Sequence, residues 1–549
     1  MRTKMAALYD AAKSTRAADL PGGKGSKDFI NSILPPELLS KIFEIGADME
    51  ETDDEFEDEE GSTDEDADED VDKDDESDDE SESDSSYDFD SLAFASLVSQ
   101  ICSAWRKVAL STPAIWRHLY VVDETPVEMI TTWLDRSKAV PLDIDISLDH
   151  KEGLTVQDLM PLLIVHVSRW RSFDCHTAVA EQMPQVMAYL LGKEAPMLEV
   201  LVLNDQEEED LEHVTYNYPV HSIFAGPASL PKLKVLALWT SPVIWASHPF
   251  SNLVDLELCY IVQGTRPSLQ QFIALLQSSP KLEKLLMSGD VVDLADFENL
   301  GQAPDPIVLD SLRALTITEF ETPIGVNHII RLLNPPNLVE LSITDLCFDR
   351  EGDPVDFTPT FNLLSSGVFL KVETLQIAYV TCADPESLER WFCNLKELRK
   401  LHLIVPRPPT EEREGRTGAG TSVANADPDL AFHFLRAFVP PKMRPPLGLP
   451  ALPVNLVCPL LEELTTSGVP DKILVMFAEA RKSQEVPLAS IVHDGRDEIS
   501  SKSRDRLEEL GVELEEYEET EYGVESEDDE DDEYVDGGLL QNFTIHFGL

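Results

Sequence analysis

The residues that could do chemistry are scattered along this chain of 549 residues rather than grouped. There is no Gly-x-Ser-x-Gly nucleophile elbow, no phosphate-binding glycine loop and no His-Glu-x-x-His zinc motif. The 12 histidines stand singly, and four of them lie beside apolar residues, as structural histidines do: His118, His166, His402 and His433. We therefore expect no catalytic residue, no metal site and no cofactor, and an interaction protein rather than an enzyme.

Carboxylates are abundant, but most lie in runs that cannot hold them in place. Residues 47–91 contain 27 acids and one lysine, and residues 508–536 contain 17 acids and no base. Such segments cannot form a packed core, so their acids are not preorganised for proton transfer. Asp66, Asp68 and Asp70 alternate as in a calcium loop, but the glycine of such a loop is missing. The formal net charge of −61 also argues against a nucleic-acid binder.

Three interpretations of the first acidic run remain open. It could be a solvated spacer, a segment that recruits a basic partner such as a histone-like protein, or a regulated switch. Serines followed by acids are candidate acceptors for an acid-directed kinase in both runs: Ser62, Ser77, Ser81, Ser83 and Ser526.

Seven cysteines occur without a Cys-x-x-Cys pair, which favours buried, reduced thiols in a cytoplasmic or nuclear protein. No stretch approaches 18 uninterrupted apolar residues, so we expect no membrane span. Residues 1–27 lack the apolar region of a secretory signal and are expected to be a disordered leader, with a mitochondrial transit peptide as the alternative.

Two apolar stretches with helical spacing flank the first acidic run. Pro35 and Pro36 suit the first turn of a helix, and Gly46 is its expected end. The second stretch, capped by Asp90 or Ser91, keeps the 3.6-residue period through Phe94, Leu97, Val98, Ile101, Trp105 and Val108. A short third helix should begin at Pro113. Helices this short cannot bury all their apolar surface alone, so part of it should face a partner or the following domain.

The motif runs Leu-Pro-Pro-Glu-Leu-Leu-x-x-Ile-Phe from Leu34, Leu-Val-Ser-Gln-Ile-Cys-x-x-Trp-Arg-x-Val-Ala from Leu97, and Ser-Thr-Pro-x-Ile-Trp from Ser111. This motif resembles an F-box. The chain is similar to the F-box-like proteins with degenerate leucine-rich repeats that are abundant in mushroom-forming fungi. It departs from their pattern by the acidic insertion at residues 47–91.

The resemblance implies a partner, because an F-box docks a Skp-type adaptor and so joins a cullin-RING ubiquitin ligase. It implies that apolar residues of both halves contact the adaptor, while some of them also hold the module together. The adaptor-binding residues expected on this basis are Leu34, Pro35, Leu38, Ile42, Phe43, Leu97, Val98, Cys102 and Trp105.

Beyond Trp116 the pattern Leu-x-x-Leu-x-Leu recurs, with helix-like runs such as 269–276, 327–333 and 385–392 between its copies. A strand followed by a helix, repeated, predicts parallel strands with right-handed crossovers, stacked as a solenoid. An ordinary α/β domain with a parallel sheet is the alternative. The copies begin at Leu198, Leu233, Leu253, Leu282, Leu312, Leu338, Val372, Leu398 and Leu461.

Strand positions between the leucines should form the inner, ligand-binding face of the solenoid. They include Val202, Ala237, Glu257, Thr316, Ser342, Gln376 and His402. Three aromatic residues near the strand ends are candidates for exposed contacts. The substrate-binding candidates are therefore Trp239, Trp245, Tyr260, Gln376 and His402.

We predict an α/β fold in which an N-terminal three-helix F-box-like module precedes an irregular leucine-rich-repeat solenoid of parallel strands with helical crossovers. The expected parts are a leader (1–27), the F-box-like domain (28–120) interrupted by the disordered insertion (47–91), the solenoid (121–514) with a disordered loop (406–428), and an acidic tail (515–549). Further helices are expected over 127–137, 154–167, 430–439 and 473–481, and strands over 141–148 and 488–492.

This organisation favours a substrate-recognition subunit of a Skp–cullin–F-box type ubiquitin ligase, with a protein substrate on the repeats. Nucleic acid and membrane are not expected as partners. Two alternatives remain open: a repeat scaffold without a ligase partner, and an acidic nuclear chaperone for basic proteins.

Overall fold

The computed structural model describes residues 34–53, 94–150, 153–179, 182–205, 220, 222–226, 228–246, 249–293, 304–320, 323–344, 356–405, 434–439, 457–497 and 499–517. The chain divides into two compact units. The first is Met1–Leu119 with Glu128–Leu142, and the second is Tyr120–Val127 with Asp143–Leu549.

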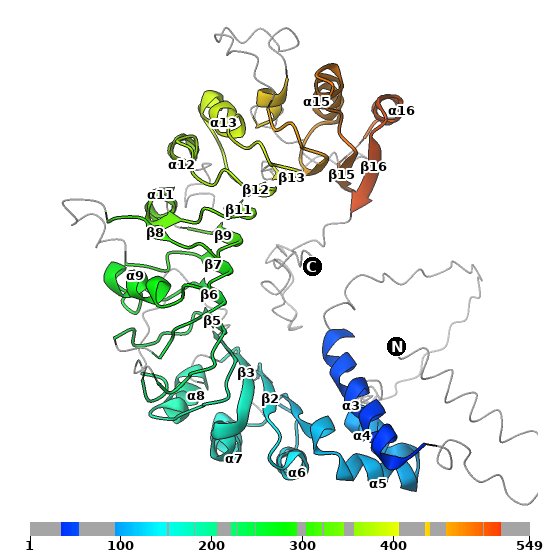
Figure 1. Ribbon diagram of the computed structural model, residues 1–549, viewed down its shortest axis with the longest axis vertical. Helices are drawn as coiled ribbons and strands as arrows, with labels where there is room; N and C mark the ends of the chain where they lie inside the picture. Colours follow the sequence, from blue (N-terminus) through cyan, green and yellow to red (C-terminus); the bar gives the residue numbers. More distant parts are fainter. Residues whose placement is uncertain are drawn as a thin grey trace, which may run out of the picture. The chain divides into compact units, whose positions relative to one another are not determined.

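The first unit is helical (Figure 1). Aromatic side chains pack between its helices. The ring of Phe43 lies 5.1 Å from that of Trp105 and 6.4 Å from that of Phe94, and the rings of Trp116 and Trp133 are 4.7 Å apart. Such pairs add to the stabilisation that burial alone provides. The elements are α3 (Pro36–Asp53), α4 (Phe94–Ile101), α5 (Ser103–Ser111), the 3₁₀ helix η3 (Pro113–Trp116) and α6 (Val127–Ser137).

Two boundaries in this unit differ from the predictions. Helix α3 does not end at Gly46 but continues to Asp53, so residues 47–53 belong to the helix and not to the acidic insertion. The second predicted helix is broken at Cys102, which has an extended backbone and accepts a hydrogen bond from the Trp105 N–H through Sγ. Because this thiol caps the start of α5, the chain can restart a helix after one residue, and the apolar period hides the break.

Gly46 lies within α3 because Phe94 occupies the space that a side chain would need. A Cβ at Gly46 would be 2.2 Å from Cζ of Phe94. The glycine therefore permits close approach of α4 and is not a helix stop.

We expect Gly46→Ala to destabilise the first unit by up to about 2 kcal/mol. Displacing the Phe94 ring costs roughly 1–3 kcal/mol, and alanine recovers about 1 kcal/mol of helix propensity. Hydrogen exchange of the α3 and α4 amides in the full chain measures the difference. In a Phe94→Leu background the same substitution should stabilise the unit, and a loss of protection there would contradict the explanation.

The second unit is organised by a 14-stranded sheet. Each pair of neighbouring strands from β3 to β16 is parallel, and strands consecutive in the sheet follow one another along the chain. A separate pair, β8 (Ile307–Val308) with β10 (Leu333–Asn334), is also parallel. The strands of the large sheet are β1 (His118–Val121), β2 (Leu142–Leu148), β3 (Trp170–Thr177), β4 (Val200–Asp205), β5 (Val235–Trp239), β6 (Asp255–Cys259), β7 (Lys284–Ser288), β9 (Ala314–Thr318), β11 (Glu340–Thr344), β12 (Thr374–Ala378), β13 (Lys400–Ile404), β14 (Glu463–Ser467), β15 (Ser490–Asp494) and β16 (Glu513–Tyr517).

Helices connect the strands and lie along the outer side of this sheet (Figure 1). Local signals set their ends: Ser268 and Gln271 form a capping box at α9, and Gly511, with φ of +82°, ends α16. The helices are α7 (Val156–Leu163), η4 (Ile164–Arg169), α8 (Gln182–Leu190), α9 (Leu269–Gln277), α11 (Pro323–Leu332), α12 (Thr358–Leu364), α13 (Pro385–Phe392), η5 (Arg436–Phe438), α15 (Asp471–Ser483) and α16 (Ser501–Leu510). The described residues therefore confirm an α/β solenoid of parallel strands with helical crossovers.

The leucines of the repeated motif stack in one row under the sheet. Each side chain of the row is buried, and full burial of one such residue contributes about 1.5–3 kcal/mol. Each repeat buries its leucines against its neighbours, which is why no repeat is stable alone. Strand pairing aligns Leu201, Leu236, Leu256, Leu285, Leu315, Leu341, Leu375, Leu401, Leu464 and Ile491.

Several strands are followed directly by a residue with left-handed backbone. Thr240, Tyr260 and Tyr379 have φ of 50°, 51° and 53°. The N–H of each donates to the carbonyl of the last residue of the next strand, as Thr240 does to Cys259 and Tyr260 to Ser288. This conformation costs a non-glycine residue roughly 1–2 kcal/mol, so the hydrogen bonds between repeats must hold it.

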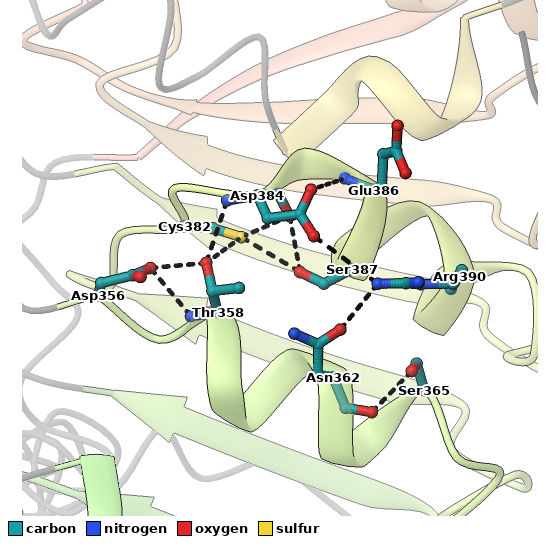
Figure 2. A network of polar contacts seen from close by, with 9 residues as sticks. All are labelled: Asp356, Thr358, Asn362, Ser365, Cys382, Asp384, Glu386, Ser387 and Arg390. Carbon is teal, nitrogen blue, oxygen red and sulfur yellow. Dashed lines mark hydrogen bonds and ion pairs between the residues drawn. The ribbon is translucent and has the colours of Figure 1, made fainter. Parts of the chain in front are cut away.

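A polar network joins the starts of α12 and α13 (Figure 2). The Asp356 carboxylate accepts hydrogen bonds from the Thr358 hydroxyl and N–H and from the Ala383 N–H, and Asp384 Oδ1 accepts one from the Glu386 N–H. Burial tends to raise the pKa of Asp356, but these hydrogen bonds outweigh it and lower that pKa. Because the network satisfies N-terminal donors of both helices, we interpret it as a structural link between repeats.

Arg481 of α15 is fully buried, and its guanidinium donates hydrogen bonds to three backbone carbonyls. Its Nη1 donates to Val457 O at 2.9 Å and to Cys458 O at 3.0 Å, and its Nη2 donates to Leu461 O at 3.0 Å. Burial lowers the pKa of Arg481 to about 10. The guanidinium thus fixes the turn that leads into β14.

Most predicted elements beyond Trp116 are found with small shifts. The prediction of 127–137 matches α6, whereas 154–167 forms α7 followed by η4, and β15 begins two residues later than predicted. β16 ends at Tyr517, so residues 515–517 belong to the sheet and not to the acidic tail. The loop 406–428 and most of both acidic runs lie outside the described residues.

Candidate functional site

Helix α3 carries two apolar stripes, one buried and one exposed. Leu39, Phe43 and Ala47 are buried. The other stripe has the 4-3-4 spacing by which helices pair with one another. Its residues are Leu38 (54% exposed), Ile42 (48%), Ile45 (49%) and Met49 (39%).

Helix α4 repeats this division over its two turns. Ala95 and Val98 are buried, whereas Leu97 and Ile101, four residues apart, are about half exposed. We call Leu38, Ile42, Ile45, Met49, Leu97 and Ile101 the apolar face of the first unit. Large apolar side chains left exposed on two helices in this way are typical of a binding surface.

The structure separates the predicted adaptor-binding residues into two groups. Leu38, Ile42 and Leu97 belong to the apolar face, and Pro35 is exposed beside it in sequence. Phe43 and Val98 are buried in the core, so they hold the helices together. The others are half-buried: Leu34, Cys102, which caps α5, and Trp105, whose ring contacts Phe43.

Three members of the apolar face were not predicted: Ile45, Met49 and Ile101. The signal was present, because they continue the spacing of Leu38, Ile42 and Leu97. The expected helix end at Gly46 concealed Met49.

Charged side chains near the apolar face pair locally, Lys41 with Glu44 at 3.0 Å and Arg117 with Asp48. Exposed pairs of this kind contribute little energy.

The inner face of the sheet is the second candidate surface. Strand pairing places the predicted positions in one row, in which Thr316 lies beside Ser342, Ser342 beside Gln376, and Gln376 beside His402. These side chains are half-buried, in contrast to the buried leucines between them. The row can therefore offer polar contacts without disturbing the core.

One of the three aromatic candidates is not at the surface as expected. Trp239 and Tyr260 are half-buried at the strand ends. Trp245 is not exposed: it is buried, its ring lies 6.4 Å from that of Phe250, and its indole N–H donates to Thr265 O at 2.8 Å. A buried tryptophan with a satisfied N–H is a core residue and no longer a contact candidate.

Polar side chains gather on the inner face at β3 to β6. His176 Nε2 lies 2.9 Å from Asp174 Oδ1, and His176 Nδ1 lies 3.1 Å from Asn204 Nδ2. Burial opposes protonation, but the hydrogen bond and charge of Asp174 raise the pKa of His176. Burial, with the nearby charge of Asp255, raises the pKa of Glu257. These groups are linked to one another, so we assign them to support of the sheet.

We expect His402 to make the repeats sensitive to acid. Burial lowers the pKa of His402, with Lys400 acting in the same direction and Glu463 against it. The unfolded chain then binds a proton first, so stability falls as the pH drops below about 6.5, by at most ~1.4 kcal/mol per unit of pKa shift. Hydrogen exchange of β13 at pH 5 and pH 8 should show this loss, and His402→Gln should reduce it.

His176→Gln is the matched control. The pKa of His176 is raised, so its contribution is present at low pH and is lost as the pH rises. The two substitutions should therefore change the pH dependence in opposite directions, and a change in the same direction would contradict the assignment.

The remaining candidate chemistry is not assembled by the described residues. Among them, no three His, Cys, Asp or Glu side chains are placed to hold a metal ion. Cys175 and Cys259 are buried, and burial raises the pKa of both thiols well above the usual range. No helix in the described part of the chain is long and apolar enough to span a membrane. The candidate phosphorylation sites Ser62, Ser77, Ser81, Ser83 and Ser526 lie outside the described residues.

Comparisons with known proteins add little to this geometry. No protein-family model matches the chain, and no curated protein matches it. Among solved structures it is similar to the Rad7 and Elc1 complex in yeast, with 12% identity over 74% of this chain and 76% of that chain and a TM-score of 0.32. These values are too low to transfer a fold or a function, so the architecture rests on the chain's own repeats.

Proposed function

We propose that this chain is the substrate-recognition subunit of a Skp–cullin–F-box type ubiquitin ligase and has no active site of its own. The apolar face carries the proposal. It lies on α3 and α4, the helices whose sequence resembles an F-box, and it leaves six large apolar side chains at the surface.

In this proposal the apolar face docks a Skp-type adaptor. Leu38, Ile42 and Leu97 are the central anchors, since a few buried apolar side chains carry most of the energy of an interface. Ile45, Met49 and Ile101 extend the same contact. Phe43, Val98 and Trp105 act indirectly by holding α3 against α4 and α5.

The repeats bind a protein substrate through the inner face of the sheet. Trp239, Tyr260, Gln376 and His402 are the candidate contacts that remain at least partly accessible. The mechanism is proximity: a bound substrate has a high effective concentration at a ubiquitin-loaded enzyme held by the same complex. The chain then acts in the cytoplasm, the nucleus or both, and requires no cofactor.

Co-purification with a Skp-type adaptor tests the proposal. The full chain should retain the adaptor, and Leu38→Asp with Ile42→Asp should weaken binding at least 100-fold, because two carboxylates cannot be buried in an apolar interface. Val165→Asp with Ile324→Asp, at exposed apolar positions of the second unit, is the matched control and should bind normally. Hydrogen exchange of α4 and α5 verifies that the first unit stays folded.

The alternatives give different results in the same experiment. If the adaptor is absent and histones co-purify, the chain is an acidic chaperone acting through residues 47–91 and 508–536. If neither partner is retained, a repeat scaffold without a ligase partner is the better description.

A further inference from the structure

Residues 434–439 lie in the helical layer of the second unit, between α13 and α15. Phe434 and Leu435 are α-helical and lead into the three-residue η5. The described residues nearest to them in sequence are Val405 and Val457. Every residue of this segment, Phe434-Leu435-Arg436-Ala437-Phe438-Val439, is buried.

Side chains at alternate positions of the segment contact three different helices. The Phe434 ring lies 6.4 Å from Phe361 of α12. The Phe438 ring lies 5.1 Å from both Phe392 of α13 and Phe477 of α15. The segment therefore fills the aromatic groove between α12, α13 and α15.

Between these two rings, Arg436 meets a carboxylate inside the groove. Arg436 Nε lies 3.0 Å from Glu389 Oε1, and the two side chains are only 4% and 3% exposed. Arg436 Nη1 has no hydrogen-bond partner among the described residues. A carboxylate buried this deeply needs a cation, so Glu389 makes the groove selective for a positive charge between two apolar anchors.

The sheet does not depend on the segment for its continuity. β13 pairs directly with β14 in an unbroken register from Lys400 opposite Glu463 to Ile404 opposite Ser467. The α15 side contributes a hydrogen bond from Gln484 Nε2 to Phe438 O at 3.0 Å, which is a contact to the segment's backbone and not to a strand.

We propose that residues 434–439 are an intramolecular ligand of a peptide-binding groove formed by α12, α13 and α15. The groove recognises a segment in which an arginine is flanked at two residues on either side by aromatic side chains. A partner protein carrying such a segment competes with residues 434–439 for the groove. This inference does not depend on the proposed ligase function.

The test uses the full chain with Phe434→Ser, Arg436→Gln and Phe438→Ser, which empties the groove. The probe is a fluorescent synthetic peptide with the sequence of residues 430–443. We expect it to bind this variant at least tenfold more tightly than the unaltered chain, in which the tethered segment competes. A peptide carrying Arg436→Gln should bind at least tenfold more weakly than the unaltered peptide.

Adding Glu389→Gln to the triple variant provides the specificity control. It should weaken binding of the arginine peptide and leave binding of the glutamine peptide nearly unchanged, because only the arginine pairs with the carboxylate. Hydrogen exchange of β13 and β14 is measured in parallel. The proposal is overturned if the triple variant loses protection in these strands, which would make the segment an integral part of its repeat. Absent or arginine-independent peptide binding also overturns it.

Discussion

Phe43→Ala is expected to destabilise the first unit by about 3–5 kcal/mol, whereas Ile42→Ala at the adjacent position should change its stability by less than about 0.5 kcal/mol. The Phe43 ring is buried against Trp105 and Phe94, so its removal leaves a cavity. Ile42 is about half exposed on the apolar face and touches little of the core. Hydrogen exchange of the α4 and α5 amides in the full chain measures both effects.

The two variants should differ in the opposite way in adaptor binding. Relative to the stability that each loses, Ile42→Ala should lose more affinity for the adaptor than Phe43→Ala. Ile42→Ala should weaken binding while the helices stay protected, and Phe43→Ala should weaken it only as far as the unit unfolds. Equal loss of protection in both variants would show that the two stripes of α3 are not divided between core and surface.

Arg481→Leu is the second large effect, with an expected loss of about 3–5 kcal/mol in the C-terminal repeats. The substitution keeps an apolar stem but removes the donors to Val457, Cys458 and Leu461. Each buried carbonyl left without a partner costs roughly 1–3 kcal/mol, offset in part because a buried charge is also removed. Loss of hydrogen-exchange protection in β14 and α15 measures the effect.

Arg390→Leu is a suitable control, because Arg390 is half exposed and its Nη2 donates to Asn362 on the surface. It should cost less than about 1 kcal/mol. If Arg481→Leu were as mild, the guanidinium would be a replaceable filler of the core and not the group that fixes the turn before β14.

The repeats could be predicted from sequence because one local pattern determines them. Leucines at fixed spacing are buried in every strand of the large sheet from β4 to β13, and the strand ends follow from that spacing within a residue or two. Helices α8 and α12 were not predicted. α8 contains Pro184 and α12 is only seven residues long, so neither shows a clear apolar period.

The candidate site could be predicted in composition but not in orientation. Leu38 and Leu39 are identical in type, and Ile42 and Phe43 are both large apolar residues, so only contacts with α4 and α5 decide which stripe is buried. Those contacts come from Phe94 and Trp105, far away in sequence. Trp245 failed as a surface candidate for the same reason, since its partner is the carbonyl of Thr265.

The uniform register of the strands spaces the side chains of the inner face at regular intervals. Adjacent strands are about 4.8 Å apart, so Thr316, Ser342, Gln376 and His402 present one side chain at each such division. A helix laid across them offers one residue per turn of about 5.4 Å and stays nearly in step over several strands. An extended chain offers a side chain on one face only every ~6.7 Å and loses step by the second strand. The spacing of the strands therefore favours a helical ligand over an extended one, whatever the individual side chains are.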